Sequence, residues 1–212
     1  MRSETALTGS HGFSVIEQAF THGAGSSGPD HEGGTAVRYA ESPSVCCDVY
    51  VEAAPSRVWA LVTDIGLPAR LSPELQRAEW LDGAEGPAAG TCFAGYNRHR
   101  MIGEWRTVSH VVECEEQRVF GWAVVDADGR FGDPAPDPAK PLATWRFELE
   151  PEGTGCRLRQ FARIGPGRSG VSLAIERAPE REEEILAFRL AELRTNMEAT
   201  LRGFKALAEE AG

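Results

Sequence analysis

The sequence predicts an α+β fold in which a curved antiparallel sheet wraps around one long C-terminal helix. Three observations predict it. One strand-like run opens the domain and is followed by two short helical segments. A series of strand-like runs with short connections comes next, and a long amphipathic helix closes the chain. If the sheet does not close fully on that helix, a cavity is left between them, which is a common place for a ligand site.

The first elements are indicated by alternation and by helix-start residues. The stretch SVCCDVYVE alternates apolar and polar residues, as a half-buried strand does, and its adjacent Cys46 and Cys47 should point to opposite faces. In AAPSRVWALVTDIG, Pro55 suits a first helical turn, and Gly66 is expected to end the helix. A second short helix is expected in LPARLSPEL and a strand in LQRAEWLDG.

Five further runs rich in aromatic and β-branched residues predict strands joined by hairpins. They are GTCFAGYNRHR, GEWRTVSHVVECEE, RVFGWAVVD, ATWRFELEPEG and GCRLRQFARIG. Residues 126–142 contain four prolines and four aspartates and cannot form a strand. So long a loop in a compact domain is either disordered or functional, and a lid is one option.

The last helix is expected at residues 180–209, with Pro179 and an acidic first turn before its apolar stripe. The stripe recurs at steps of three and four residues, which marks one continuous apolar face against the sheet. Its members are Leu186, Leu190, Leu193, Met197, Leu201, Phe204 and Leu207 or Ala208.

Residues 1–43 are expected to be a flexible N-terminal extension, and residues 44–212 the folded domain. The stretch THGAGSSGPDHEGG has little to bury, although GFSVIEQAF before it is compatible with one short helix. Three histidines lie here, at His11, His22 and His31, but their spacing matches no metal-ligand pattern. We therefore expect solvated histidines and no metal site.

Composition excludes several classes of protein. The net charge of −10 argues against a nucleic-acid binder and against adhesion to anionic membranes. No apolar run approaches the roughly 20 residues of a membrane span. The five cysteines are odd in number and lack ligand spacing, which is typical of reduced thiols in a cytoplasmic protein.

The segments VEAAPSRVWALVTDIGLPARLSPELQRAEWLDG, GTCFAGYNRHR with EWRTVSHVV, and TNMEATLRGFKALAE together resemble the START-like (SRPBCC) superfamily. More narrowly, they resemble bacterial proteins of the polyketide cyclase/dehydrase type, over about residues 44–209. The resemblance implies the helix-grip fold: a seven-stranded antiparallel sheet curved around a long C-terminal helix, with two short helices after the first strand. It also implies a cavity for a hydrophobic or aromatic small molecule. We expect the protein to be a monomer or a homodimer.

Within that cavity, the resemblance favours the face of GTCFAGYNRHR that carries Phe93, Gly95 and Asn97. Asn97 needs a partner if it is buried, and a backbone-bonding Asn is as good an explanation as a ligand contact. His99 follows in phase and is a candidate acid or base, although an exposed surface histidine is the more frequent case. Asn97 and His99 are thus the two candidate catalytic residues.

Other strands contribute in-phase residues that suit a planar ligand, with ordinary core packing as the alternative. Phe120 shares a face with Trp122, and Phe147 with Trp145, whereas His110 is expected on the outer face. The full set of expected ligand-binding residues is Phe93, Asn97, Trp105, Thr107, Trp122, Trp145 and Gln160.

Arg98, Arg100 and Arg106 form a local basic cluster on this acidic chain. It is suited to a carboxylate or to the phosphopantetheine of an acyl carrier protein at the cavity mouth, or else to ordinary surface ion pairs. No nucleophile elbow, P-loop, dinucleotide fingerprint or HExxH motif occurs, and no cofactor is expected. Three functions stay open: a polyketide cyclase or aromatase that folds its substrate and polarises carbonyls, a non-catalytic carrier or sequestering protein, and a module that regulates a partner.

Overall fold

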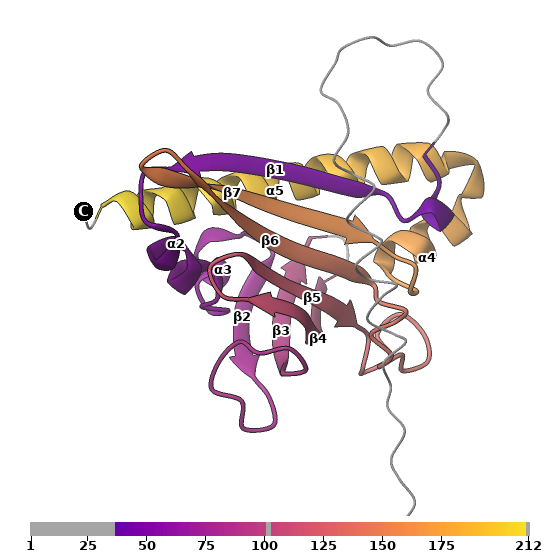
Figure 1. Cartoon of the computed structure of the whole chain (residues 1–212). Coiled ribbons are helices and arrows are strands. Elements are labelled where there is room, and N and C mark those ends of the chain that lie inside the picture. The colour runs from indigo at the N-terminus through magenta and orange to yellow at the C-terminus, as the bar shows by residue number, and fades with distance from the viewer. Residues whose placement is uncertain (1–36, 101–102, 211–212) are drawn as a thin grey trace, which may run out of the picture. The chain divides into compact units, whose positions relative to one another are not determined.

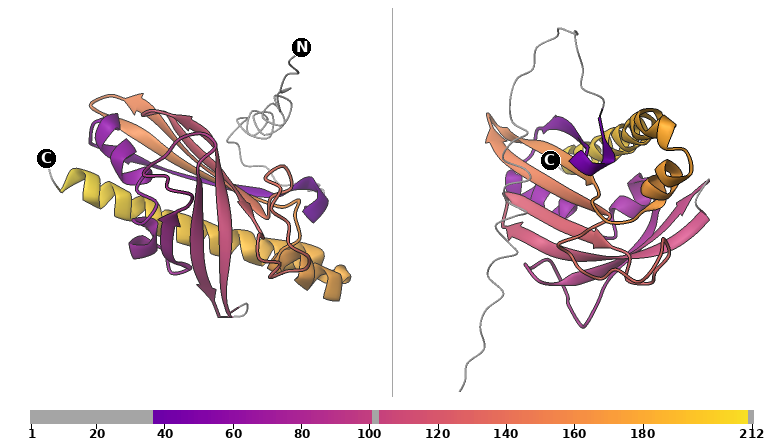
Figure 2. Two further views of the ribbon diagram at one scale, coloured as in Figure 1. Left: turned by 90° about the horizontal axis from the view of Figure 1, so that it is seen from below. Right: turned by 90° about the vertical axis from the view of Figure 1, so that its right-hand side faces the viewer.

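The computed structural model describes residues 37–100 and 103–210. Seven antiparallel strands form one sheet in the order β1-β7-β6-β5-β4-β3-β2. The strands are β1 (Ser44–Val51), β2 (Leu75–Trp80), β3 (Cys92–His99), β4 (Gly103–Glu115), β5 (Val119–Val125), β6 (Ala143–Glu152) and β7 (Gly155–Ile164). The sheet curves around the C-terminal helix α5 (Glu182–Glu209), as Figure 1 and the end-on view in Figure 2 show. The predicted α+β helix-grip architecture is confirmed.

Helix α5 buries its apolar stripe on the concave face of the sheet. Its 28 residues extend about 42 Å at 1.5 Å per residue. The stripe is confirmed with small changes, since Leu190 and Leu207 are only half-buried and Thr200 joins the buried set. At one end of α5, Phe204 packs edge-on against Phe147 of β6, with ring centroids 5.6 Å apart. This core holds α5 in place while leaving room nearer its N-terminus.

Two short helices, α2 (Pro55–Val62) and α3 (Pro68–Leu71), follow β1 and close one end of the sheet. The expectation that Gly66 ends the first of them is wrong, because the helix stops at Val62. Thr63 caps it, and its hydroxyl donates to the carbonyl of Trp59 at 2.7 Å. A turn between Asp64 and Leu67 then redirects the chain into α3.

A fourth helix, α4 (Gly170–Arg177), lies between β7 and α5 and was not expected from the sequence. Its start is a capping box, in which Ser169 and Ser172 each bond the other's backbone N–H. Because the second member is Ser and not the usual Glu or Gln, the sequence signal is weak. A short 3₁₀ turn, Pro179–Arg181, then leads into α5.

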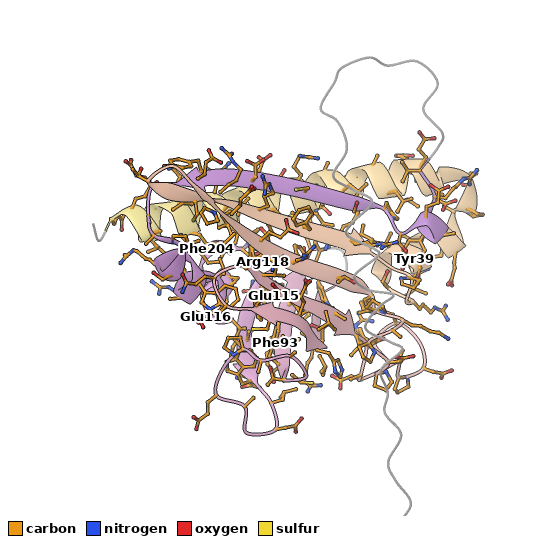
Figure 3. The ribbon with its side chains drawn as sticks, in the orientation of Figure 1. Tyr39, Phe93, Glu115, Glu116, Arg118 and Phe204 are labelled. Atoms are coloured by element: carbon orange, nitrogen blue, oxygen red, sulfur yellow. The ribbon has the colours of Figure 1, made fainter. Side chains whose placement is uncertain are left out.

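The folded part begins before the expected boundary at Ser44. A 3₁₀ turn at Tyr39–Glu41 packs beside α4, at the end of the sheet opposite Phe204 (Figure 3). The Tyr39 hydroxyl donates to the carbonyl of Gly167 at 2.5 Å, and the Tyr39 N–H donates to Glu182 at 2.7 Å. The expected helix in GFSVIEQAF and the three N-terminal histidines lie outside the described residues.

Candidate functional site

A cavity of about 230 Å³ lies between the concave face of the sheet and the middle of α5, from Arg189 to Thr200. Its wall is mostly apolar and strongly aromatic. The aromatic residues that line it are Phe93, Trp105, Phe120, Trp122, Phe131, Trp145 and Phe147. A concave apolar site with a few polar groups is the usual form of a small-molecule site.

The indole of Trp122 is the centre of the aromatic wall. Its ring centroid lies 5.9 Å from that of Phe93 and 5.8 Å from that of Phe147. Trp145 on the neighbouring strand stacks nearly parallel to it, with an interplanar angle of 11° and centroids 6.4 Å apart. These rings pack against one another as in a protein core, and they also line the cavity. Core packing and a place in the cavity wall, which the sequence offered as alternatives, therefore apply to the same residues.

Strand register brings the seven residues expected to bind a ligand onto this one surface. Trp105 pairs with Asn97, and Trp145 pairs with Trp122. Gln160 of β7 lies opposite Phe147 of β6. All seven line the cavity. Their contact with a ligand stays a prediction, because no ligand is present in the structure.

Asn97 forms a small polar cluster with Gly95 and Thr107 on the wall made by β3 and β4. Its amide nitrogen donates to the carbonyl of Gly95 at 3.3 Å and approaches the Thr107 hydroxyl at 3.4 Å. A Cβ atom at Gly95 would stand 3.2 Å from that hydroxyl, so the glycine leaves room for the cluster. Both bonds are long, and a ligand oxygen can compete for the Asn97 amide.

Gln160 carries a buried amide oxygen that has no hydrogen-bond partner. The residue is 6% exposed and lines the cavity from β7. An unpaired buried polar group costs roughly 1–3 kcal/mol, so it calls for an explanation, and a ligand or water that bonds to it is one. Gln160 is therefore the polar feature of the wall that most clearly lacks a protein partner.

A charged pair between Glu74, just before β2, and Arg189 of α5 reaches the cavity. The Arg189 guanidinium donates two hydrogen bonds to the carboxylate, at 3.0 and 2.8 Å. Burial alone would lower the pKa of Arg189, but its hydrogen bonds to Glu74 and the nearby Glu192 carboxylate raise the pKa above its ordinary value. The pair ties the helix to the edge of the sheet beside the cavity.

His99 does not line the cavity and lies instead in an open groove beside it, which shares Glu74 and Asn196 with the cavity wall. Its Nε2 is 3.4 Å from Glu192 of α5, and its side chain is 12% exposed. The expectation of an exposed histidine is therefore wrong, because α5 covers the end of β3. Its acid–base role stays a prediction.

The arginine cluster does not converge on one point. Arg98 pairs with Glu104 at 2.7 Å and Arg106 pairs with Asp128 at 2.8 Å, both on the outer side of the sheet. Arg100 borders the same open groove as His99. Surface ion pairs thus account for Arg98 and Arg106. His110 is on the outer face as expected, with its Nδ1 3.3 Å from the sulfur of Cys92.

Several cavity residues were not found from the sequence. Phe131 comes from the long loop, Ser169 and Val171 from the start of the unexpected helix α4 and the residue before it, and Glu74 with Arg189 from distant segments. No local pattern marks these positions. The one weak signal is that Arg189 is a charged residue directly beside Leu190 of the apolar stripe.

Within residues 37–100 and 103–210, no group of three His, Cys, Asp or Glu side chains could hold a metal ion. All five cysteines are unpaired. No helix in the described part of the chain is long and apolar enough to span a membrane.

Residues 43–209 match the family model described as polyketide cyclase / dehydrase and lipid transport. The chain therefore belongs to this family, and the resemblance drawn from the sequence is confirmed. Comparison with curated proteins gives no match.

Solved structures agree on the fold. A polyketide-cyclase-like protein from Corynebacterium glutamicum is 28% identical, with a TM-score of 0.53 over 78% of this chain and 91% of that one. The di-domain ARO/CYC protein BexL of the BE-7585A biosynthetic pathway is 17% identical, with a TM-score of 0.57 over 78% of this chain and 50% of BexL. StfQ, a di-domain ARO/CYC protein of the steffimycin pathway, is 16% identical, with a TM-score of 0.57 over 79% of this chain and 51% of StfQ. This chain thus spans about half the length of each di-domain protein.

Proposed function

We propose that this protein binds a compact, mainly hydrophobic aromatic molecule that carries at least one hydrogen-bonding group. The observation that carries the proposal is the unpaired Gln160 amide oxygen in the wall of an otherwise aromatic cavity. Aromatic walls supply contact area, and a hydroxyl or N–H of the ligand would satisfy the amide. At about 230 Å³ the cavity is smaller than the roughly 300–1,000 Å³ common for ligand pockets, which favours a compact ligand over a long chain.

Binding without chemistry is the function that the geometry supports best. Among the described residues that line the cavity, the charged groups are Glu74, Arg163 and Arg189, and no histidine is among them. Glu74 is engaged by Arg189, which keeps it from acting as a free base. A carrier or sequestering role for a small molecule needs only the walls described above.

Polyketide cyclisation or aromatisation is the second candidate, and the Asn97–Thr107 cluster favours it. A poly-β-ketone folded against the aromatic wall would bring a carbonyl oxygen to the Asn97 amide, which would stabilise charge that develops on enolisation. The family description and the ARO/CYC proteins that share the fold support this candidate. An acyl carrier protein would then be the partner that delivers the chain, and Arg100 borders the groove where it would approach.

We also propose that the protein is cytoplasmic and that it is a monomer or a homodimer. The unpaired state of all five thiols supports a reducing compartment.

The test is ligand capture by the purified protein. Native mass spectrometry of the protein as isolated would identify a retained molecule. Titration with the neutral fluorophore 2-naphthol would measure the affinity of the cavity for a small aromatic molecule. Ala143→Leu fills the cavity wall and should weaken naphthol binding about tenfold. Ala206→Leu adds the same volume on the exposed face of α5 and should leave binding unchanged. Equal affinities for both variants would contradict the proposal.

The catalytic candidate has its own test. Asn97→Ala should abolish turnover of a linear poly-β-ketone thioester while naphthol binding stays within about threefold of the wild type. Absence of turnover by the wild-type protein, with binding intact, would leave binding alone as the function.

A further inference from the structure

The loop between β5 and β6 contributes one aromatic side chain to the cavity wall. Phe131 is 7% exposed, although the loop itself carries prolines and charges and lies at the surface. Phe131 lines the cavity together with Leu142 from the other end of the same loop. The residues around Phe131 hold it in this position at three levels.

The first level is Asp126, which is 2% exposed at the start of the loop. Its carboxylate accepts the backbone N–H groups of Arg130 and Phe131, each at 2.8 Å. Its carbonyl accepts the N–H of Ala135 at 2.8 Å, in an isolated bridge. A buried carboxylate with two backbone donors fixes the turn that presents Phe131.

The second level is a close packing of the loop on itself. Gly129 has a φ of 72°, and a Cβ atom there would stand 2.8 Å from the carbonyl oxygen of Gly132. Only glycine fits this approach without a shift of the backbone. The turn from Asp126 to Gly132 is therefore compact, with Phe131 near its end.

The third level ties the loop to its neighbours on both sides. Arg106 of β4 pairs with Asp128 at 2.8 and 3.0 Å. On the other side, the N–H groups of Gly165 and Gly167, which lead into α4, donate to the carbonyls of Leu142 and Pro141 at 2.7 Å each. The loop and the start of α4 thus form one continuous end wall of the cavity, to which Ser169 and Val171 also contribute.

We infer that Phe131 is the residue that limits the length of ligand this cavity accepts, and that Asp126 positions it. The inference rests on the proposed binding function and adds a size limit: small fused aromatics fit, and longer ones meet the phenyl ring of Phe131. Replacing the ring with a methyl group would extend the cavity toward the loop, because Asp126 holds the backbone independently of the side chain at 131.

The experiment compares two neutral fluorescent probes, 2-naphthol and the longer 1-hydroxypyrene, on the full-length protein. In wild type, naphthol should bind and hydroxypyrene should bind at least about tenfold more weakly. Phe131→Ala should shift the ratio of the two dissociation constants by about tenfold or more in favour of hydroxypyrene, and Phe131→Leu by less. Phe188→Ala removes an exposed aromatic that does not line the cavity and should not change the ratio.

Asp126→Asn places an NH₂ group against one of the two backbone N–H donors, so it should loosen the turn and shift the ratio in the same direction. Thermal unfolding identifies any variant that fails to fold. If Phe131→Ala does not fold, Phe131→Leu serves as the test in its place. Equal weakening of both probes in the Phe131 variants, or no change, would overturn the inference while the proposed function stands. Failure of both probes to bind wild type would overturn the proposed function and this inference with it.

Discussion

Arg189 and Glu74 are 115 residues apart in the chain and form a two-bond ion pair across the edge of the cavity. Their side chains are 18% and 17% exposed, so each charge is mostly removed from water. The pair joins α5 to the chain entering β2, the strand at the end of the sheet. It therefore links α5 to the edge of the sheet that β2 forms.

Glu74→Ala should lower the free energy of unfolding by about 2–3 kcal/mol, because it leaves the mostly buried Arg189 charge without its main partner. Urea denaturation would measure the change. Arg189→Met alone should have a similar cost, but the double variant should lose much less than the sum of the two. Strictly additive losses would show that the pair is not coupled.

The sequence predicted this fold well because its elements follow simple periods. Alternation placed Asn97, Trp105 and Gln160 on the inner face, since a period of two is set by backbone geometry alone. The apolar stripe of α5 followed from the helical period in the same way.

The remaining parts of the site depend on contacts that no local pattern records. The partner of Glu74 lies far along the chain, and Phe131 is buried only because Asp126 folds a proline-rich loop inward. His99 lies on the same face of β3 as Asn97, as predicted. Its side chain contacts Glu192 of α5 and not the cavity, because β3 extends past the end of the cavity. These outcomes are decided by tertiary packing.

Gln160→Met should raise stability and weaken ligand binding at the same time. The substitution removes a buried amide oxygen that has no partner, so the free energy of unfolding should rise by about 1 kcal/mol. The same change deletes the group proposed to meet a ligand hydroxyl, so affinity for 2-naphthol should fall about tenfold, while affinity for naphthalene should not. Denaturation and paired titrations would check this, and a loss of stability would mean that the amide has a structural partner.

His110 should make the protein less stable as the pH falls toward 5. Burial lowers the pKa of His110 below its ordinary value of 6.5. The unfolded chain therefore binds a proton more readily than the folded one, and stability is complete above 6.5 and declines as the pH falls through that value toward the lower folded pKa.

His110→Gln should remove this part of the pH dependence. Urea denaturation of both proteins between pH 8 and pH 5 would give the difference, in which the contributions of other groups cancel. The stability of wild type relative to His110→Gln should decrease as the pH falls, and a constant difference would show that His110 does not titrate differently on folding.

Tyr39→Phe should lower the free energy of unfolding by about 1 kcal/mol, because the Gly167 carbonyl loses the hydroxyl that donates to it. The ring would remain against Gly165, so the effect isolates the contacts of the hydroxyl just before α4, which are its bond to Gly167 and its 3.2 Å contact with the Ser169 hydroxyl. Tyr50→Phe is the matched control, because the Tyr50 hydroxyl is exposed and its contact with the Thr154 hydroxyl is long, at 3.4 Å. This substitution should cost less than about 0.5 kcal/mol.

Since α4 and the residues before it form the end wall of the cavity, Tyr39→Phe should also speed the release of 2-naphthol in a stopped-flow displacement. Unchanged release, together with the loss of stability, would mean that the segment before β1 supports the fold without holding the end wall closed.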